Sequence, residues 1–309
     1  MAHSRIGFIG AGKMASAMIK GWVSAGTVAA ADIVVAAPST RSTGPLCEAF
    51  KDLVLADSNV DVVQQSTVVF LAVKPHILHG VLGEIRPRVT PAHLVVTIAA
   101  GVTTAQVEAM LGRGARVVRV VPNTPCAVRC NAGAVCGGEN ASEDDVKRVR
   151  KLFAPLAADG EEPDEVPESL MDAVTGLAGS GPAFVFTFIE AMADGGVYSG
   201  LPRHVALRLA AQTVLGSARL VLESDEHPAA LRDAVCSPGG TTIEGVRALE
   251  RGGMRSAVID AVTSAAAKGG QLRKQAEKQA AAALAEAAAE AAAGSLASSP
   301  GAAASARAE

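Results

Sequence analysis

Short apolar runs alternate with helix-like segments through the first half of the chain, and this alternation constrains the fold more than any other feature. Each run is rich in Val and Ile and has the length of a strand buried on both faces. Apolar strands joined by helices predict a parallel sheet with helices on both sides. The predicted strands cover residues 5–10, 32–36, 67–73, 94–99 and 116–121, and the helices between them cover residues 13–25, 44–51, 75–86 and 103–111.

The pattern changes near Pro167. A hairpin-like region around residues 132–136, a helix over residues 143–156 and a turn-rich stretch complete the first half. Beyond them strand-like runs are absent, and several helices begin near a proline, where the missing N–H group costs nothing. The predicted helices of this second half cover residues 168–177, 182–198, 202–223, 228–235, 242–250 and 254–277.

Together these patterns predict an α/β protein. We expect an N-terminal Rossmann-type domain with a doubly wound, mostly parallel sheet over residues 1–167, followed by an all-helical substrate and dimerisation domain over residues 168–278. Residues 279–309 form an Ala-rich, low-complexity tail without an apolar stripe large enough to dock it. We expect a frayed helical extension followed by disordered chain, and we assign it no function.

Composition excludes several classes of function. The 309 residues suit two domains, and a net charge of −3 with only 3% aromatic residues argues against nucleic-acid binding. No uninterrupted apolar run approaches the ~20 residues that cross a bilayer, so we expect no membrane partner. The first predicted strand starts within a few residues of Met1 and no secretory signal precedes it, so we expect a cytoplasmic protein.

The cysteines and histidines lack the spacing that is typical of a metal site. The five cysteines form an odd set without a CxxC pair, which is typical of a reduced intracellular compartment. Cys126, Cys130 and Cys136 could be imagined around a metal, but they are more loosely spaced than the paired ligands of structural zinc sites. His76 and His79 lie among apolar residues and indicate a helix surface. We therefore expect no metal.

The stretch from Gly10 to Ala15 matches the pattern G-x-G-x-x-A. It follows the strand that ends near Ile9 and opens a helix, which distinguishes a dinucleotide-binding turn from a Gly-rich turn without a ligand. The first glycine permits the tight turn, Gly12 lets a pyrophosphate approach the backbone, and Ala15 allows close helix packing. Free N–H groups and the dipole at the helix start favour phosphates. The predicted cofactor contacts here are Ile9, Gly10, Ala11, Gly12, Lys13, Met14 and Ala15.

The end of the second predicted strand indicates which dinucleotide is bound. NAD-binding proteins place an Asp or Glu there, which accepts from the ribose 2′-hydroxyl. This chain has Ser39, Thr40 and Arg41 instead, and hydroxyl and guanidinium donors match the oxygens of a 2′-phosphate. We therefore expect NADPH, with NADH possible. The alternative for Arg41 is an ordinary solvated loop arginine.

Two further loops follow predicted strands and should border the cofactor crevice. One is Ala72-Val73-Lys74-Pro75, and the other contains Ala100. Their small residues would let the nicotinamide half lie against the backbone. Lys74 contacts cofactor or substrate, or is merely a charged helix start. Asn59 is similarly a cofactor contact or a plain helix cap.

A Pro-Gly-Gly turn runs into a helix in the second half, at Ser237-Pro238-Gly239-Gly240-Thr241-Thr242. Thr241 and Glu244 fit the S/T-x-x-E capping box, which explains part of the stretch. A capping box does not need two glycines, however. Consecutive glycines expose N–H groups in a concave loop at a helix N-terminus, which suits a carboxylate. Thr242 would then offer a hydroxyl close to the bound acid.

With these motifs in place, the chain resembles pyrroline-5-carboxylate reductases over roughly residues 4–275. The resemblance rests on motifs that occur in the expected order, and SPGGTT after GSGPA is highly specific. They are GFIGAGKMA, AVKP at 72–75, VPNTP at 121–125, TGLAGSGPAF at 175–184, ADGGV at 193–197 and SPGGTTIEG at 237–245. The Ala-rich tail lies outside the resemblance.

The resemblance implies reduction of the cyclic imine 1-pyrroline-5-carboxylate to L-proline with NAD(P)H. It implies that Thr242 is the catalytic residue and hydrogen-bonds the ring nitrogen, and that backbone groups of Ser237, Gly240 and Thr241 hold the substrate carboxylate. Glu168 matches a family residue near the substrate. Residues 10–15, Asn59, residues 72–75 and Ala100 match cofactor positions of the family. One position departs, because some relatives have Asn where this chain has Ala234.

The chemistry agrees with this implication. A protonated imine is already an electrophile for hydride, so the protein must mainly hold and orient it, and a strong general acid is optional. A ketone-reducing enzyme would more plausibly display a proton donor such as a His-Asp pair. Two alternatives stay open: another two-domain NADP-dependent dehydrogenase of the β-hydroxyacid dehydrogenase type, and a nonenzymatic NADPH-sensing protein.

The helices at 182–198 and 202–223 are apolar over much of their surface. Helices this apolar must be buried, and a helical domain of this size is too small to cover both. We therefore expect a homodimer or a larger homo-oligomer, with a decamer possible, as the family resemblance also implies. The alternative is the core of a monomer.

Overall fold

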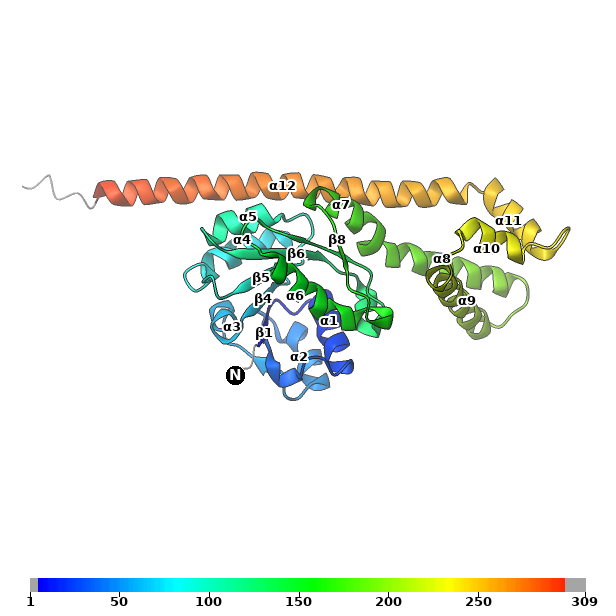
Figure 1. Ribbon diagram of the computed structural model, residues 1–309, viewed down its shortest axis with the longest axis horizontal. Coiled ribbons are helices and arrows are strands. Elements are labelled where there is room, and N and C mark those ends of the chain that lie inside the picture. The colour runs from blue at the N-terminus through cyan, green and yellow to red at the C-terminus, as the bar shows by residue number, and fades with distance from the viewer. Residues whose placement is uncertain (1–4, 298–309) are drawn as a thin grey trace, which may run out of the picture. The chain divides into compact units, whose positions relative to one another are not determined.

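The structure, a computed structural model, describes residues 5–297, with the side chains of the last helix described as far as residue 282. The chain divides into two compact units (Figure 1). The first, here called the sheet unit, runs up to Val174 and resumes at Lys268. The second, the helical unit, covers Thr175–Ala267. The predicted domain boundaries at residues 167 and 278 stay a prediction.

The sheet unit is built around an eight-stranded sheet within the described residues, in the order β3-β2-β1-β4-β5-β6-β7-β8. All neighbouring pairs are parallel except β6 and β7. The chain order reverses between β1 and β4, and ligands of such sheets bind outside the carboxyl ends of the strands at this point. The strands are β1 (Ile6–Ile9), β2 (Ile33–Ala36), β3 (Val54–Leu55), β4 (Val68–Leu71), β5 (Leu94–Thr97), β6 (Arg116–Val121), β7 (Ala134–Gly137) and β8 (Asp164–Glu165).

Helices cover both faces of this sheet. Side chains alternate across each strand, so Phe8 and Phe70 point to one face while Ile9 and Leu71 point to the other. Phe8 and Phe70 stack with their ring centroids 4.9 Å apart. The first face is covered by α1 (Lys13–Ser24), α2 (Thr40–Ala49) and α6 (Glu143–Phe153), and the second by α3 (Asn59–Gln65), α4 (Pro75–Ile85) and α5 (Thr104–Leu111).

The helical unit has a small core. Helices α8 and α9 pack through Ala193, Ala206 and Ala210, which are buried. Many large apolar side chains of the unit are exposed instead, among them Phe186 at 62% and Leu222 at 78%. Its helices are α8 (Gly181–Tyr198), α9 (Arg203–Glu223), α10 (Pro228–Val235), α11 (Thr241–Arg251) and the first turns of α12 (Met254–Ala297).

Two segments of the chain are long and apolar enough, by length and composition only, to cross a membrane. They are Glu168–Tyr198 and Arg203–Glu223, and each is about one-tenth buried. Neither contains an uninterrupted apolar run of about 20 residues. The core helix of a soluble protein passes the same test, so two such segments are weak evidence for a membrane.

The five predicted strands are confirmed, and the fold class is as expected. Strands β3 and β8 and helix α3 were missed, since each is too short to show a periodicity. Helix α2 begins at Thr40 rather than Gly44, because Pro45 lies inside the helix and not at its start. The predicted helix 168–177 is broken into a 3-10 turn Glu168–Leu170, helix α7 (Met171–Val174) and a π turn Thr175–Gly179.

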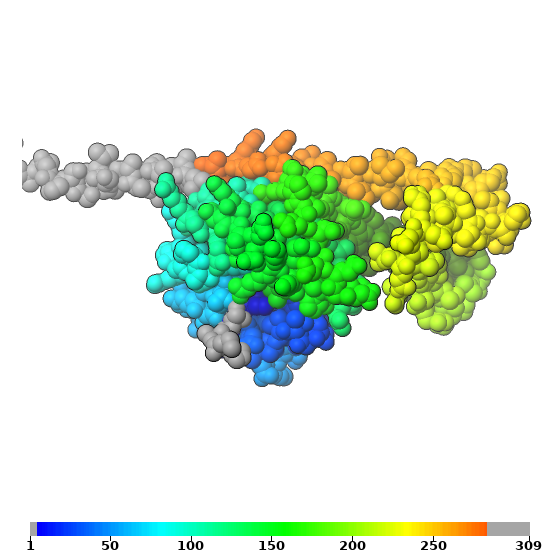
Figure 2. Space-filling model, viewed as in Figure 1, coloured from blue at the N-terminus to red at the C-terminus, as the bar shows by residue number. Residues whose placement is uncertain are grey.

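The first residues of the predicted tail pack against the sheet unit, although no docking was expected there. Helix α12 continues without interruption to Ala297, and Gln279 and Ala280 line a small cavity against α4 and α5. The start of the tail therefore contacts the sheet unit, and in Figure 2 it is the end of the orange part of α12, next to the grey atoms. The predicted disorder at residues 298–309 lies outside the described residues.

Candidate active site

The turn between β1 and α1 lies where the chain order of the sheet reverses. Gly10 has a φ of +100°, and a Cβ there would lie 2.6 Å from the carbonyl oxygen of Ala72, so only glycine fits. Ala15 is buried where α1 meets the sheet. At Gly12, by contrast, no heavy atom of the described chain lies within 4 Å of where a Cβ would be. Packing within the protein does not require glycine at this position, whereas close approach of a ligand would.

Helix α1 begins at this turn with an open N-terminus. Gly12 is its N-cap, no side chain in the described residues caps it, and no acidic residue lies in its first turn. The first N–H groups of the helix are thus left for another acceptor, and the dipole favours an anion.

A groove with a volume of about 590 Å³ runs beside this helix start. It brings four of the predicted cofactor residues to one place, namely Ala11, Gly12, Lys13 and Arg41. Lys20 lies there too and was missed by the sequence analysis, although it follows Lys13 at i+7 and so occupies the same helix face. No ion pair within the described chain neutralises these three cations, so the groove suits an anionic ligand.

Ser39 and Thr40 play a local part at the start of α2. Ser39 is the N-cap, and its Oγ accepts from the backbone N–H of Arg41 at 3.2 Å. Neither residue lines the groove, but Arg41 does. Arg41 is exposed and lies in the first turn of α2, and its contact with a 2′-phosphate stays a prediction.

The loops after β4 and β5 lie at the same edge of the sheet. Lys74 is the N-cap residue of α4 but does not cap it with its side chain, and Pro75 takes the first helical position. In the second loop Ala99 and Gly101 are buried while Ala100 between them is exposed. Ala100 is therefore the member of this loop that is accessible to a ligand.

Asn59 is not a helix cap. The N-cap of α3 is Ser58, whose hydroxyl accepts from the backbone N–H of Asp61 at 3.1 Å. Asn59 is the first helical residue, and its Nδ2 donates to Glu84 Oε2 at 2.7 Å. Its proposed contact with the cofactor stays a prediction.

The Pro-Gly-Gly turn forms a second open helix start, in the helical unit. Gly239 has a φ of +68°, and the N–H of Gly240 donates to the carbonyl of Ser237 at 3.0 Å. A Cβ at Gly240 would collide with the Ser237 hydroxyl. Gly240 is the N-cap of α11 and provides no side-chain cap, and Thr242 lies half-buried in the first turn.

The predicted capping box at this helix is wrong. A box would require Thr241 at the N-cap, but the helix begins one position earlier than that pattern implies, with Thr241 already helical. Glu244 instead accepts from Arg247 Nη1 at 2.8 Å. Because neither side chain satisfies the first N–H groups of α11, these groups are free to donate to a carboxylate.

Glu168, predicted near the substrate, has close protein partners. Its two oxygens accept from the backbone N–H of Thr104 at 2.8 Å and from the Thr104 hydroxyl at 2.9 Å. Arg119, which is almost fully buried, donates to it at 3.3 Å. Glu168 therefore holds the N-terminus of α5, and its role toward a substrate stays a prediction.

The cysteines are all free thiols. Burial raises the pKa of Cys126 to about 12, and burial together with the charge of Glu168 raises that of Cys136 to about 12. Within the described residues no group of three or more His, Cys, Asp or Glu side chains is placed to hold a metal. Protonated thiols are poor nucleophiles and poor metal ligands, so these two have a packing role.

Comparison with known proteins relates both units to one family. Residues 168–272 match the family model described as pyrroline-5-carboxylate reductase dimerisation, and residues 5–101 match that described as NADP oxidoreductase, coenzyme F420-dependent. A pyrroline-5-carboxylate reductase of Methanosarcina acetivorans is 44% identical over 281 residues, covering 89% of this chain and all of the relative. That of Escherichia coli is 43% identical, covering 88% of this chain and 99% of the relative.

Solved structures agree with the sequence relatives. The crystal structure of Plasmodium falciparum pyrroline carboxylate reductase with NADP bound has a TM-score of 0.80 and 32% identity, covering 88% of this chain and 99% of that one. A ketol-acid reductoisomerase from an uncultured archaean, at 12% identity and a TM-score of 0.59, shares only the fold.

Proposed function

This chain belongs to the pyrroline-5-carboxylate reductase family, and on that premise we propose that it reduces the cyclic imine 1-pyrroline-5-carboxylate to L-proline. It is an NAD(P)H-dependent oxidoreductase, and the reaction is the final step of proline biosynthesis. The observation that carries this function is the 44% identity over the full length of a relative with that name. The uncapped N-termini of α1 and α11 leave backbone N–H groups that can donate to the cofactor phosphates and to the substrate carboxylate.

The proposed chemistry needs little more than orientation. Hydride from the nicotinamide adds to the imine carbon, and the ring nitrogen, protonated before or during transfer, becomes the amine of proline. Thr242 hydrogen-bonds the ring nitrogen and fixes its direction. Backbone groups of Ser237, Gly240 and Thr241 hold the substrate carboxylate at the N-terminus of α11, where the helix dipole favours negative charge.

NADPH is the proposed preferred cofactor. The observation that supports it is the groove in which Arg41, Lys13 and Lys20 meet without acidic partners in the described chain. A 2′-phosphate carries about two negative charges and three acceptor oxygens, which these side chains can match. NADH lacks that phosphate, so it would gain nothing from Arg41.

The proposed active form is a homodimer or a larger assembly in the cytoplasm. Its support is the exposed apolar surface of α8 and α9 in a segment that matches a dimerisation model. A partner chain would cover this surface, so we propose no membrane and no nucleic acid as partners. The substrate is a small molecule.

A cofactor-oxidation assay with the imine tests the function, and Thr242→Ala tests the assigned residue. We expect wild type to oxidise NADPH faster than NADH, and Thr242→Ala to lose turnover by about a hundredfold while NADPH binding is kept. Thr241→Ala is the matched control, because only the backbone of Thr241 is assigned to the substrate. Equal losses in both variants would contradict the assignment.

The same assay separates the alternatives. Turnover with β-hydroxyacids but not with the imine would indicate a dehydrogenase of the β-hydroxyacid type. NADPH binding without turnover on either substrate would indicate a cofactor-sensing protein.

A further inference from the structure

An ionic network centred on a buried arginine links four segments of the sheet unit. Its centre is Arg119 on β6, whose side chain is 1% exposed. Arg119 pairs with Glu168 at 3.3 Å and with Asp172 of α7 at 3.7 Å. Asp172 in turn accepts from Arg273 of α12 at 2.9 Å. Arg273 also donates to Glu277 at 2.9 Å.

Arg273 is the only described residue that hydrogen-bonds the carboxylate of Asp172. At 3.7 Å the contact between Arg119 Nη2 and Asp172 Oδ1 is an ion pair but not a hydrogen bond, and both atoms are buried without a hydrogen-bond partner in the described chain. Removing Arg273 would therefore leave a mostly buried carboxylate with one long contact. The contacts of α7 with β6 and α12, which this carboxylate joins, would then be weakened.

Two members of the network, Glu168 and Arg273, contact the loop between β5 and α5. At the end of this loop, Glu168 holds Thr104 by two hydrogen bonds. In the middle of the loop, Gly101 has a φ of +72°, and a Cβ there would lie 2.9 Å from the backbone nitrogen of Arg273. The backbone of α12 thus packs directly against this loop at Gly101. The adjacent loop residue, Ala100, is exposed.

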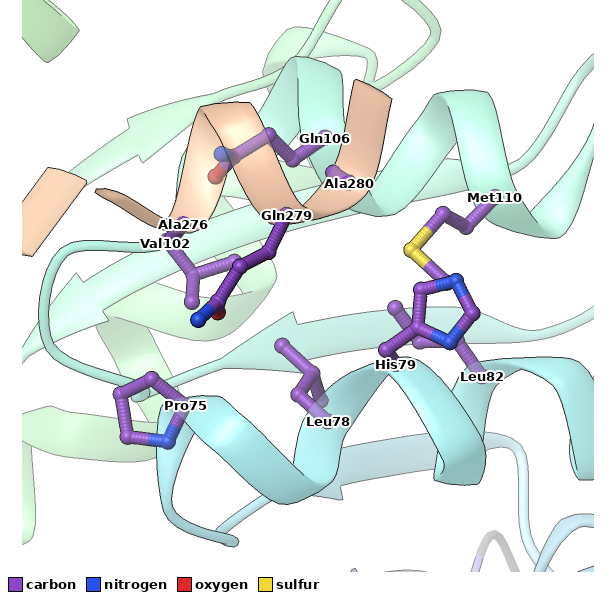
Figure 3. A pocket seen from close by; sticks show the side chains of 10 residues that line it. All are labelled: Pro75, Leu78, His79, Leu82, Val102, Gln106, Met110, Ala276, Gln279 and Ala280. Carbon is purple, nitrogen blue, oxygen red and sulfur yellow. The ribbon is translucent and has the colours of Figure 1, made fainter. Parts of the chain in front are cut away.

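The same stretch of α12 also reaches the start of α4. Figure 3 shows Ala276, Gln279 and Ala280 facing α4 and α5 across a cavity of only about 30 Å³, with Pro75 and Val102 at its edge. A space of that size holds about one water molecule, so the three helices are closely packed. Pro75 is itself a proposed cofactor contact, and Val102 lies two residues after another, Ala100.

We propose that Arg273 is a positioning residue for the dinucleotide. Through Asp172 it locks α12 against the loop at 99–102 and the start of α4, so that both loops keep the conformation in which they border the nicotinamide. This proposal rests on the proposed cofactor position of those loops. Arg273 lies just beyond residue 272, where the match to the dimerisation model ends.

Arg273→Gln and Lys274→Gln form a matched pair. Both remove one cation from the same helix, but Lys274 is exposed and belongs to no described ion pair. We expect Arg273→Gln to weaken NADPH binding about fivefold, and Lys274→Gln to leave it unchanged. The dissociation constant is measured from NADPH fluorescence on the full chain. The KM for the imine should stay at its wild-type value in both variants.

A second variant guards against a merely structural explanation. Glu277→Gln removes the other partner of Arg273 but keeps Asp172 paired, so we expect a weaker effect on NADPH binding than in Arg273→Gln. Unchanged NADPH binding in Arg273→Gln, or a loss that merely parallels a fall in melting temperature in all three variants, would overturn the proposal. The binding readout needs no imine, so it stands even if the chain fails to turn over that substrate.

Discussion

The two compact units treat apolar side chains in opposite ways. In the sheet unit Phe8, Trp22, Phe70 and Phe153 are wholly buried, and their rings contact one another on one face of the sheet. In the helical unit the buried centre is made of alanines, while phenylalanine and leucine face outward. The sheet unit thus contains its own core, whereas the helical unit presents surface that a second chain can bury.

The largest expected effect is a loss of stability on removing a core side chain of the sheet unit. Phe70→Ala removes a ring that is fully buried and stacked on Phe8, so we expect it to lower the free energy of unfolding by about 4 kcal/mol. Chemical denaturation followed by circular dichroism measures this value. A loss below that of an ordinary surface substitution would show that the sheet unit does not depend on this core.

The same substitution in the helical unit should act on association instead. Phe186 is 62% exposed, so Phe186→Ala leaves little cavity within one chain. We expect it to raise the dimer dissociation constant about thirtyfold, as loss of an aromatic interface anchor does. Sedimentation velocity over a dilution series measures the change, with Lys274→Gln as a surface control. A wild-type chain that stays monomeric at micromolar concentration would refute the proposed assembly.

The smallest effect concerns the thiols of the sheet unit. The pKa of Cys126 is raised to about 12 in the folded chain, above the ordinary value of 9.0, so the unfolded chain releases its proton first as the pH rises. Stability is therefore unaffected below the ordinary pKa and falls above it, by about 1 kcal/mol for this thiol near pH 10. Unfolding of wild type and Cys126→Ala is compared near pH 8 and pH 10. An equal fall in both would mean that Cys126 does not cause it.

Much of the cofactor turn could be predicted because its signals are local. Gly10 makes the tight turn after β1, Gly12 begins helix α1, and Ala15 is buried where this helix packs on the sheet, as the G-x-G-x-x-A pattern indicates. Local signals failed where two patterns overlapped. Thr241 and Glu244 have the spacing of a capping box, but the Gly-Gly turn begins the helix one residue earlier. Gly44-Pro45 similarly resembles a helix start, although the helix already begins at Thr40.

The sequence by itself determined the parallel sheet, the glycine turn after β1 and the apolar helices of the second unit, because periodicity and turn chemistry act between residues only a few positions apart. Tertiary structure alone decided that Glu168 holds Thr104, 64 residues away, and that Arg273 meets Asp172 across 101 residues. Arg119 is buried in the Val-rich strand β6, and no local pattern distinguishes it from an exposed arginine. Its partners come from segments that only folding brings together, and their charges are stable there only because they meet.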